Sequence, residues 1–246
     1  MTHETPTQTA ARLLRDAEHG SKLAHLPEGV APTDEAAAYA VQDAVLAGQR
    51  VAAWKVAAIR SPEPLQTAPL TRDMMIESTL PSHIREPEIE VEIAIALVSD
   101  LPPREADYTR EEVIEALGKA HAAIEIVESR FAVRKEAAPL SALADKSSSA
   151  GVVIGSGTDA WRDLDFTTLN VTLTGAEPIA EAKGNATQEQ TINSLIWLAN
   201  HASRRGLGLM AGQYVITGAR IGPMVVKSGQ RLMAGVEGIG EVTLAV

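Results

Sequence analysis

One stretch, residues 86–97, limits what this chain can fold into more than any other part of the sequence. From Glu88 onward, acidic and branched aliphatic residues alternate with a period of two, which is typical of a half-buried β-strand. One face of this strand is aliphatic, and the other carries Glu88, Glu90, Glu92, Ala94 and Ala96. Because the second face changes from acidic to apolar within two residues, we expect it to enter a cavity and not to stay in bulk water.

Carboxylates that share a strand face repel one another, and burial raises their pKa unless a positive charge lies between them. A divalent cation can supply that charge, because Mg²⁺ prefers oxygen ligands and acids at i and i+2 can converge on one ion. The strand pattern is therefore compatible with a metal site that includes Glu90 and Glu92. This stretch alone favours the alternative, a strand whose acidic face is simply solvated, because charged runs usually face solvent.

The composition narrows the functional classes. The chain of 246 residues has no cysteine, which excludes disulfides, thiolate metal sites and a cysteine nucleophile. Its formal net charge of −10 argues against a nucleic-acid partner, which requires a basic face. We also find no signal-peptide pattern after Met1 and no apolar run of membrane-spanning length, so we expect a cytoplasmic protein without a membrane partner.

The first part of the chain predicts helices and one apolar strand. A helix is expected over residues 7–19, and Thr33 can cap a second one. Residues 51–59 predict a strand that is apolar except for Lys55, whose charge either reaches the surface or is held by a carboxylate or a substrate anion. Three prolines in residues 61–70 predict a loop, so we expect a small N-terminal α/β part over residues 1–70 and the main body over residues 71–246.

The main body combines helices with short strands. Two capping boxes, which begin at Thr109 and Thr187, predict helix starts. Glu125 lies between two isoleucines and is a second candidate for a buried carboxylate. Strands are expected over residues 152–154, 166–174, 214–217, 224–226, 231–234 and 241–246, with a small-residue loop over 143–151 and a hairpin turn at 238–240. The prediction is an α+β fold in which a mixed β-sandwich or roll follows the small N-terminal part.

Several short motifs occur together in an order that resembles a known family. They are Trp54-Lys55, Glu90-Val-Glu92, Glu125 within IEIVESR, and Ile216-Thr-Gly218 followed by GPMV. Over nearly the whole chain they resemble the 2-keto-4-pentenoate hydratase branch of the fumarylacetoacetate hydrolase superfamily. The resemblance implies the C-terminal β-roll of that superfamily for the main body, and it weighs strongly against the solvated-face alternative.

The resemblance also implies a site and a chemistry. It implies an Mg²⁺ or Mn²⁺ ion bound by Glu90, Glu92 and Glu125, with Lys55 beside the substrate. Asp145, Ser148 and Thr217 would line the pocket. The substrate would be a small 2-oxo acid or its dienol, bound through its carboxylate and C2 oxygen. A metal held by three carboxylates can polarise a ketone and stabilise an enolate, which agrees with the strand pattern.

The sequence departs from the family pattern around this site. Gln66 occupies the place of an expected acid, and a glutamine can orient a water but cannot take its proton. Lys146 replaces an asparagine, Gln213 replaces an aspartate, and a Gly-His-Pro segment before Thr187 is absent. An unpaired buried lysine is costly, so Lys146 predicts a substrate with an additional acidic group unless its side chain points to solvent.

The resemblance, together with these departures, implies three possible functions. The first is a lyase that adds water to a 2-hydroxy-2,4-dienoate in aromatic catabolism, with Lys55 as a general acid or oxyanion partner. The second is a decarboxylase of a 2-oxo-dioate, which the departure at Gln66 favours because no water needs activation. The third is a noncatalytic homologue that serves as the partner subunit of a related enzyme. The resemblance further implies a homo-oligomer built on dimers.

Overall fold

The computed structural model describes residues 4–57 and 64–246 and has an α+β architecture with N-terminal helices and two sheets. The α-helices of the described residues are α1 Pro6–His19, α2 Glu35–Leu46, α3 Arg110–Ala116, α4 Pro139–Ala144 and α5 Gln188–Arg204. The strands are β1 Val51–Ala57, β2 Gln66–Thr71, β3 Glu88–Leu97, β4 Leu117–Val127, β5 Ser149–Thr158, β6 Asn170–Thr174, β7 Pro178–Lys183, β8 Tyr214–Ile216, β9 Ile221–Val225, β10 Arg231–Val236 and β11 Gly240–Ala245.

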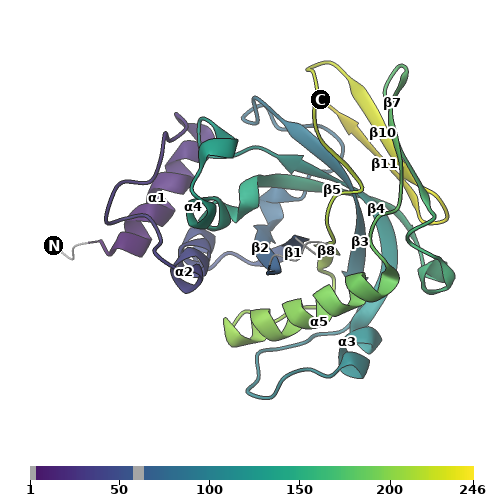
Figure 1. Cartoon of the computed structure of the whole chain (residues 1–246), viewed down its shortest axis with the longest axis horizontal. Helices are drawn as coiled ribbons and strands as arrows, with labels where there is room; N and C mark the ends of the chain where they lie inside the picture. Colours follow the sequence, from purple (N-terminus) through teal and green to yellow (C-terminus); the bar gives the residue numbers. More distant parts are fainter. Residues whose placement is uncertain (1–3, 58–63) are drawn as a thin grey trace.

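The larger sheet has the strand order β2-β1-β8-β3-β4-β5, and β9 also pairs with β3. Only the β1–β8 pair is parallel among the strand pairs of the described residues, so the sheet is mixed. The smaller sheet, with the order β11-β10-β6-β7, packs on β4 and β5 (Figure 1). The aliphatic face of β3 lies in the core between the sheets with Leu173, Leu232 and Leu244. The acidic face of β3 therefore points away from this core.

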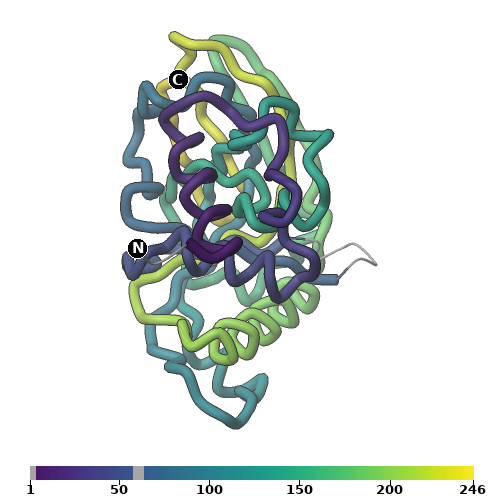
Figure 2. Tube along the Cα trace, turned by 90° about the vertical axis from the view of Figure 1, so that its left-hand side faces the viewer, coloured from purple at the N-terminus to yellow at the C-terminus, as the bar shows by residue number. Residues whose placement is uncertain are grey.

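The N-terminal helices form a second apolar cluster on one side of the large sheet (Figures 1 and 2). Its members include Leu14, Tyr39, Val41, Phe131 and Leu143. Because α4 and Phe131 belong to the segments around β4 and β5, this cluster joins the N-terminal helices to the main body. The strand β1, which precedes the expected boundary at residue 70, and β2, which crosses it, pair within the large sheet.

Four local predictions were wrong. The loop expected over residues 143–151 is shorter, because residues 143–144 end α4 and residues 149–151 begin β5. Residues 66–70 belong to β2 and not to a loop; Pro69 is tolerated because β2 is an edge strand that needs fewer backbone donors. The cap of α2 is Asp34, whose side chain accepts a hydrogen bond from the Ala37 N–H at 2.7 Å, and not Thr33. The strand expected from residue 166 begins at Asn170, because Asp165 holds the preceding residues in a turn. The end of the strand expected over residues 51–59 and the start of the loop expected over residues 61–70 lie outside the described residues.

Other local predictions are confirmed. Both capping boxes are present, at Thr109 and at Thr187, with the reciprocal hydrogen bonds of that motif. Residues 238–240 connect β10 and β11 as a hairpin turn, in which Gly238 has a φ of 71°. The strand β7 was not expected from the sequence, and it is the exposed edge of the small sheet.

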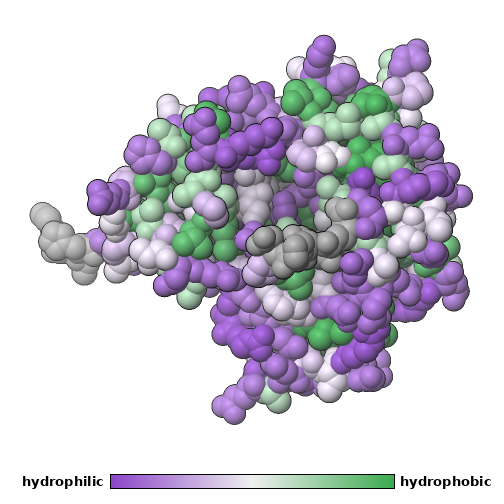
Figure 3. Space-filling view, in the orientation of Figure 1, coloured by the Kyte–Doolittle hydropathy of each residue, from purple (hydrophilic) through white to green (hydrophobic). Residues whose placement is uncertain are grey.

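No helix within residues 4–57 and 64–246 combines the length and the apolar character needed to span a membrane. The face seen in Figure 3 is largely polar, and its apolar residues occur in small separate groups. The cytoplasmic location stays a prediction.

A partly buried histidine in α5 makes stability depend on pH. His201 stacks on Trp197 with ring centroids 4.7 Å apart and meets the Tyr39 ring edge-on. Burial, with the Arg205 charge second, lowers the pKa of His201 to about 4. The unfolded chain takes up this proton below about pH 6.5 and the folded chain only near pH 4, so folding stability falls as the pH falls through this window.

His201→Phe keeps an aromatic ring and removes the titration. We expect the melting temperature of the wild type to fall more steeply between pH 7 and pH 5 than that of the variant. Differential scanning calorimetry at several pH values measures this difference. Parallel pH profiles for the two proteins would show that His201 is not responsible.

Candidate metal centre

The pairing of β3 with β4 brings three glutamates together. Glu90 lies directly opposite Glu125 in the antiparallel register, and Glu92 is two residues further along the same face of β3. One carboxylate oxygen from each of the three residues lies within 4.8 Å of the other two. Like charges directly opposite each other destabilise a sheet, so this arrangement needs a compensating positive charge.

Burial within this cluster makes a compensating positive charge more necessary. Glu92 and Glu125 are fully buried, so the solvated-face alternative is wrong and the expected turn of the acidic face into the interior is confirmed. Burial, and then the charge of Glu125, raises the pKa of Glu90 to about 7 and the pKa of Glu92 well above its usual value. Glu92 Oε1 and Glu125 Oε2 have no hydrogen-bond partner among the described residues.

Lys55 supplies one positive charge to this cluster. The register places Lys55 of β1 beside Ile216 of β8, which in turn lies beside Ala94, so the lysine shares the acidic face of the sheet. Its Nζ lies 2.9 Å from Glu125 Oε1 and donates a longer hydrogen bond of 3.4 Å to the Ser147 carbonyl. Burial alone lowers the pKa of Lys55, but Glu125 and the other two acids raise it above its usual value, so Lys55 is an ammonium at neutral pH.

The residues present fit a divalent cation. Three clustered carboxylates carry more negative charge than Lys55 can balance, and two of their buried oxygens are open for further bonds. Carboxylate oxygens are the ligands that Mg²⁺ and Mn²⁺ prefer. The floor beside the cluster is apolar and built from small or aliphatic residues, namely Ala53, Ala94, Ala123, Val152 and Ile216.

The segment after β8 forms one wall of the site. The Gly218 N–H donates a 2.6 Å hydrogen bond to Glu92 Oε2, which fixes the orientation of that carboxylate. Thr217 is buried, and its hydroxyl donates to the Ile93 carbonyl at 2.8 Å. Arg220 donates to the Thr217 carbonyl and hydroxyl, and its charge opposes the raised pKa of Glu92.

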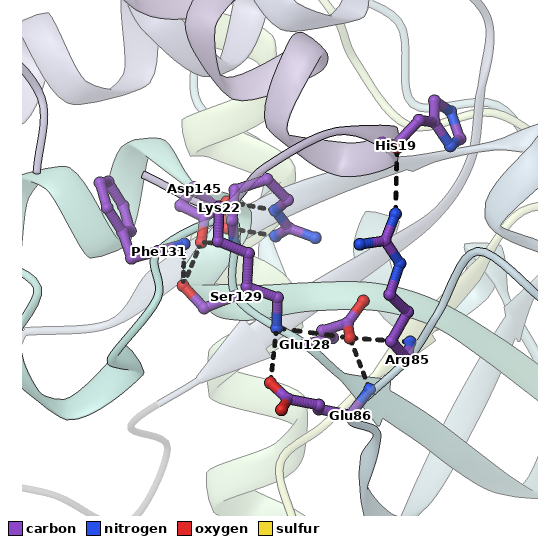
Figure 4. A network of polar contacts seen from close by, with 9 residues as sticks. His19, Lys22, Arg85, Glu86, Glu128, Ser129, Phe131 and Asp145 are labelled. Atoms are coloured by element: carbon purple, nitrogen blue, oxygen red, sulfur yellow. Dashed lines mark hydrogen bonds and ion pairs between the residues drawn. The ribbon is translucent and has the colours of Figure 1, made fainter. Parts of the chain in front are cut away.

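The other residues expected at the site are placed as follows. Gln66 lies opposite Ala57 at the start of β2, on the face that carries Lys55. Asp145 is buried and accepts hydrogen bonds from the Ser129 hydroxyl and from the main chain and guanidinium of Arg130 (Figure 4). Ser148 is also buried, and its main chain joins Asp145 to Glu128.

Lys146 is buried and has an acidic partner within the chain. Its Nζ lies 3.5 Å from Glu18 Oε1 and 3.7 Å from Met74 Sδ. The alternative that this side chain points to solvent is therefore wrong. Because Glu18 already compensates the charge, a substrate carboxylate is not required to do so.

Gln213, the third departure from the family pattern, ties β1 to β8. Its Oε1 accepts hydrogen bonds from the Trp54 indole at 3.1 Å and from the Met210 N–H at 3.0 Å. Its Nε2 donates to the Val51 carbonyl at 2.9 Å. An aspartate at this position could accept but not donate, so the amide suits these three partners.

Sequence reasoning missed two groups that contact the cluster, the Gly218 N–H and the Ser147 carbonyl. Both are main-chain atoms, so residue type gives little signal for them. The only hint for Gly218 was its place in the Ile-Thr-Gly motif, and the hint for Ser147 was its place in a loop of small residues.

Comparisons with known proteins identify the family. Residues 49–246 match the fumarylacetoacetate hydrolase C-terminal family. The chain is 32% identical over 255 residues to 2-keto-4-pentenoate hydratase 2 of Dechloromonas aromatica (strain RCB), which covers 97% of this chain and 96% of that protein. It is also 28% identical over 163 residues to 4-oxalocrotonate decarboxylase of Pseudomonas putida, across 66% of this chain and 61% of the relative.

Solved structures show the same fold. The 4-oxalocrotonate decarboxylase of Pseudomonas putida G7, complexed with magnesium and adipate, superposes with a TM-score of 0.81 at 21% identity and covers 100% of this chain and 98% of its own. Fumarylpyruvate hydrolase of Pseudomonas aeruginosa, in complex with Mn²⁺ and pyruvate, gives a TM-score of 0.55 at 17% identity over 80% of this chain and 89% of its own. The chain therefore belongs to the fumarylacetoacetate hydrolase family, in the branch that contains the 2-keto-4-pentenoate hydratases and the 4-oxalocrotonate decarboxylases.

Proposed function

We propose that this protein is a magnesium- or manganese-dependent hydro-lyase that converts a 2-hydroxy-2,4-dienoate and water into a 4-hydroxy-2-oxo acid, in the catabolism of aromatic compounds. The observation that carries this proposal is the buried cluster of Glu90, Glu92 and Glu125, with Lys55 Nζ 2.9 Å from Glu125. The similarity to a hydratase over nearly the full length of both chains supports the choice of reaction.

The three glutamates would hold the ion. When bound, the ion withdraws electrons from the C2 oxygen of the substrate and stabilises the negative charge that develops there. The carboxylate and the C2 oxygen are the two substrate groups that suit a hard cation. Asp145, Ser148 and Thr217 belong to the segments that we propose as the pocket wall.

The reaction needs two proton movements on the substrate. The 2-hydroxyl loses a proton while C5 gains one, which leaves an enone; water then adds its hydroxyl at C4 and a proton at C3. Lys55, as an ammonium held beside the cluster, would stabilise negative charge at the C2 oxygen and hold a proton there. Gln66 would orient the water through its amide, which cannot take the proton.

The decarboxylase is the second candidate, because one relative carries that activity and Gln66 offers no base. It requires a 2-oxo-dioate, and Lys146 was the cation predicted to bind its second carboxylate. The ion pair between Lys146 and Glu18 weighs against that role. We therefore favour the monocarboxylate substrate and hydration.

The purified chain with Mg²⁺ separates the three functions. With 2-hydroxypenta-2,4-dienoate we expect 4-hydroxy-2-oxopentanoate as the product, identified by nuclear magnetic resonance. Release of CO₂ from 4-oxalocrotonate without hydration of the dienoate would favour the decarboxylase. Absence of turnover on both substrates would favour the noncatalytic partner subunit.

We also propose the homo-oligomer built on dimers that the resemblance implies. Light scattering is expected to give a mass above the 26.0 kDa of one chain.

A further inference from the structure

The loop beside Lys55 has an unusual backbone. Lys146, Ser147 and Ser148 have φ values of 54°, 48° and 66°, and they are three of the four non-glycine residues with positive φ among the described residues. Residues with a Cβ adopt this left-handed region at a cost, and consecutive ones are rare. Strained backbone of this kind persists only where the surroundings hold it, and it is concentrated at functional sites.

The two ends of this left-handed turn are held by main-chain hydrogen bonds. The Ser148 N–H donates to the Asp145 carbonyl at 2.9 Å, and the Glu128 N–H donates to the Ser148 carbonyl at 2.9 Å. The Asp145 carboxylate is in turn fixed by Ser129 and Arg130. These contacts anchor the turn to the end of β4, but none of them acts on the Lys146 side chain.

Glu18 of α1 supplies the carboxylate that pairs with Lys146. The lysine side chain is 10% exposed and its Nζ is 3.5 Å from Glu18 Oε1. Burial, and then the charge of Arg130, lowers the pKa of Lys146, whereas Glu18 opposes this shift. The buried ammonium therefore depends on a residue of the N-terminal helix, which lies outside the family match at residues 49–246.

Several contacts hold the C-terminal end of α1 and the residues after it against the main body (Figure 4). The His19 carbonyl accepts a hydrogen bond from Arg85 at 3.2 Å, and Lys22 pairs with Glu128 at 3.4 Å. Leu23 then exchanges two main-chain hydrogen bonds of 2.8 Å with the segment after β4. Glu18 is thus held against the same segment that carries Ser129 and Arg130.

Within residues 4–57 and 64–246, a hydrogen bond joins the turn to the candidate metal centre. Its middle residue, Ser147, directs its carbonyl to Lys55 Nζ at 3.4 Å, while Glu125 accepts from the same nitrogen at 2.9 Å. These are the two acceptors that orient the ammonium among the described residues. Loss of the left-handed turn would move the Ser147 carbonyl and leave Lys55 oriented by Glu125 alone.

We propose that Glu18 and Lys146 form a positioning pair, through which the N-terminal helix holds the left-handed turn and so aims the Ser147 carbonyl at Lys55. Among the described residues, the partners of Lys146 Nζ are Glu18 and Met74 and not the three glutamates, so we expect the pair to act through Lys55. Its effect on turnover rests on the proposed function, but its effect on the turn does not.

Hydrogen exchange tests the pair without any substrate. Glu18→Gln removes the ion-pair partner of the buried Lys146, so we expect the amides of residues 145–149 to exchange at least about tenfold faster, measured by mass spectrometry. Asp16→Asn is the matched control, because Asp16 is an exposed acid of the same helix that pairs only with Arg12 among the described residues. It should leave this exchange unchanged.

A second variant shows whether Glu18 acts through Lys146. Lys146→Asn removes the buried charge, and asparagine tolerates the left-handed region, so the turn should stay protected. In that background Glu18→Gln should have no further effect. Equal exchange in Glu18→Gln and the wild type, or equally fast exchange in Glu18→Gln with and without Lys146→Asn, would overturn the proposal.

Kinetics then test the link to Lys55. We expect Glu18→Gln to lower kcat about tenfold while the Mg²⁺ dissociation constant stays unchanged, because the three glutamates are untouched. Lys146→Asn should restore kcat in the double variant. A kcat equal to that of the wild type despite fast exchange would overturn the positioning of Lys55. A wild type without turnover would instead refute the proposed function and leave the exchange test valid.

Discussion

Glu92→Gln is expected to abolish metal-dependent activity and to make the metal-free protein more stable. The amide removes one of three ligand charges, and a bound divalent ion is worth several kcal/mol of transition-state stabilisation, so kcat/KM should fall at least about a thousandfold. The same change relieves a fully buried carboxylate whose pKa is raised by burial and by Glu125, so the apo melting temperature should rise. Glutamine can still accept the Gly218 N–H.

Glu88→Gln is the matched control for this prediction. Glu88 lies on the same strand face but pairs with Arg134 at 2.6 Å and is outside the cluster. Isothermal titration calorimetry should show weak or no Mg²⁺ binding to Glu92→Gln and unchanged binding to Glu88→Gln. An unchanged Mg²⁺ affinity in Glu92→Gln would mean that the ion binds elsewhere.

The two parts of the acid cluster were indicated by local signals, and only the resemblance to the family joined them into one site. The period of two in β3 assigns Glu90 and Glu92 to one face whatever the strand pairs with. The isoleucines around Glu125 indicate a buried strand position. Antiparallel pairing in the observed register then suffices to bring the third acid to the other two. The capping boxes were predictable from local signals, since their hydrogen bonds span only three residues.

The partner of Lys146 was not predictable, because it comes from a distant part of the chain. Nothing near Lys146 in the sequence indicates that Glu18 is its partner. Because no partner within the chain was evident, a substrate carboxylate was the hypothesis. The fold of residues 66–70 was missed for a related reason. Three prolines indicate a loop locally, and only the position of β2 at the sheet edge shows why Pro69 fits a strand.

Lys55→Met is expected to stop turnover while it tightens Mg²⁺ binding. The loss of a positioned ammonium should lower kcat by about a hundredfold or more, in the range of general acid–base groups. It also leaves Glu125 buried without its ion-pair partner, which should destabilise the apo protein by about 3 kcal/mol. A divalent ion then has no competing charge beside Glu125, so it should bind more tightly and restore much of the lost stability.

Lys119→Met is a suitable control. Lys119 lies near the start of β4, away from Glu125, and makes an exposed ion pair of 3.6 Å with Asp159. Denaturant unfolding with and without Mg²⁺ measures the stability of both variants. The interpretation of Lys55 is wrong if Lys55→Met keeps the activity and the apo stability of Lys119→Met.

The central claim is that Glu90, Glu92 and Glu125 together bind one divalent ion that receives a 2-oxo acid. A crystal structure of the protein with Mn²⁺ and pyruvate tests it most directly, because anomalous scattering locates the manganese independently of any assumed ligands. We expect one manganese peak bonded to a carboxylate oxygen of each of the three glutamates, with pyruvate on its open side and Lys55 beside the pyruvate. A peak at another place, or no peak between these carboxylates at saturating Mn²⁺, would contradict it.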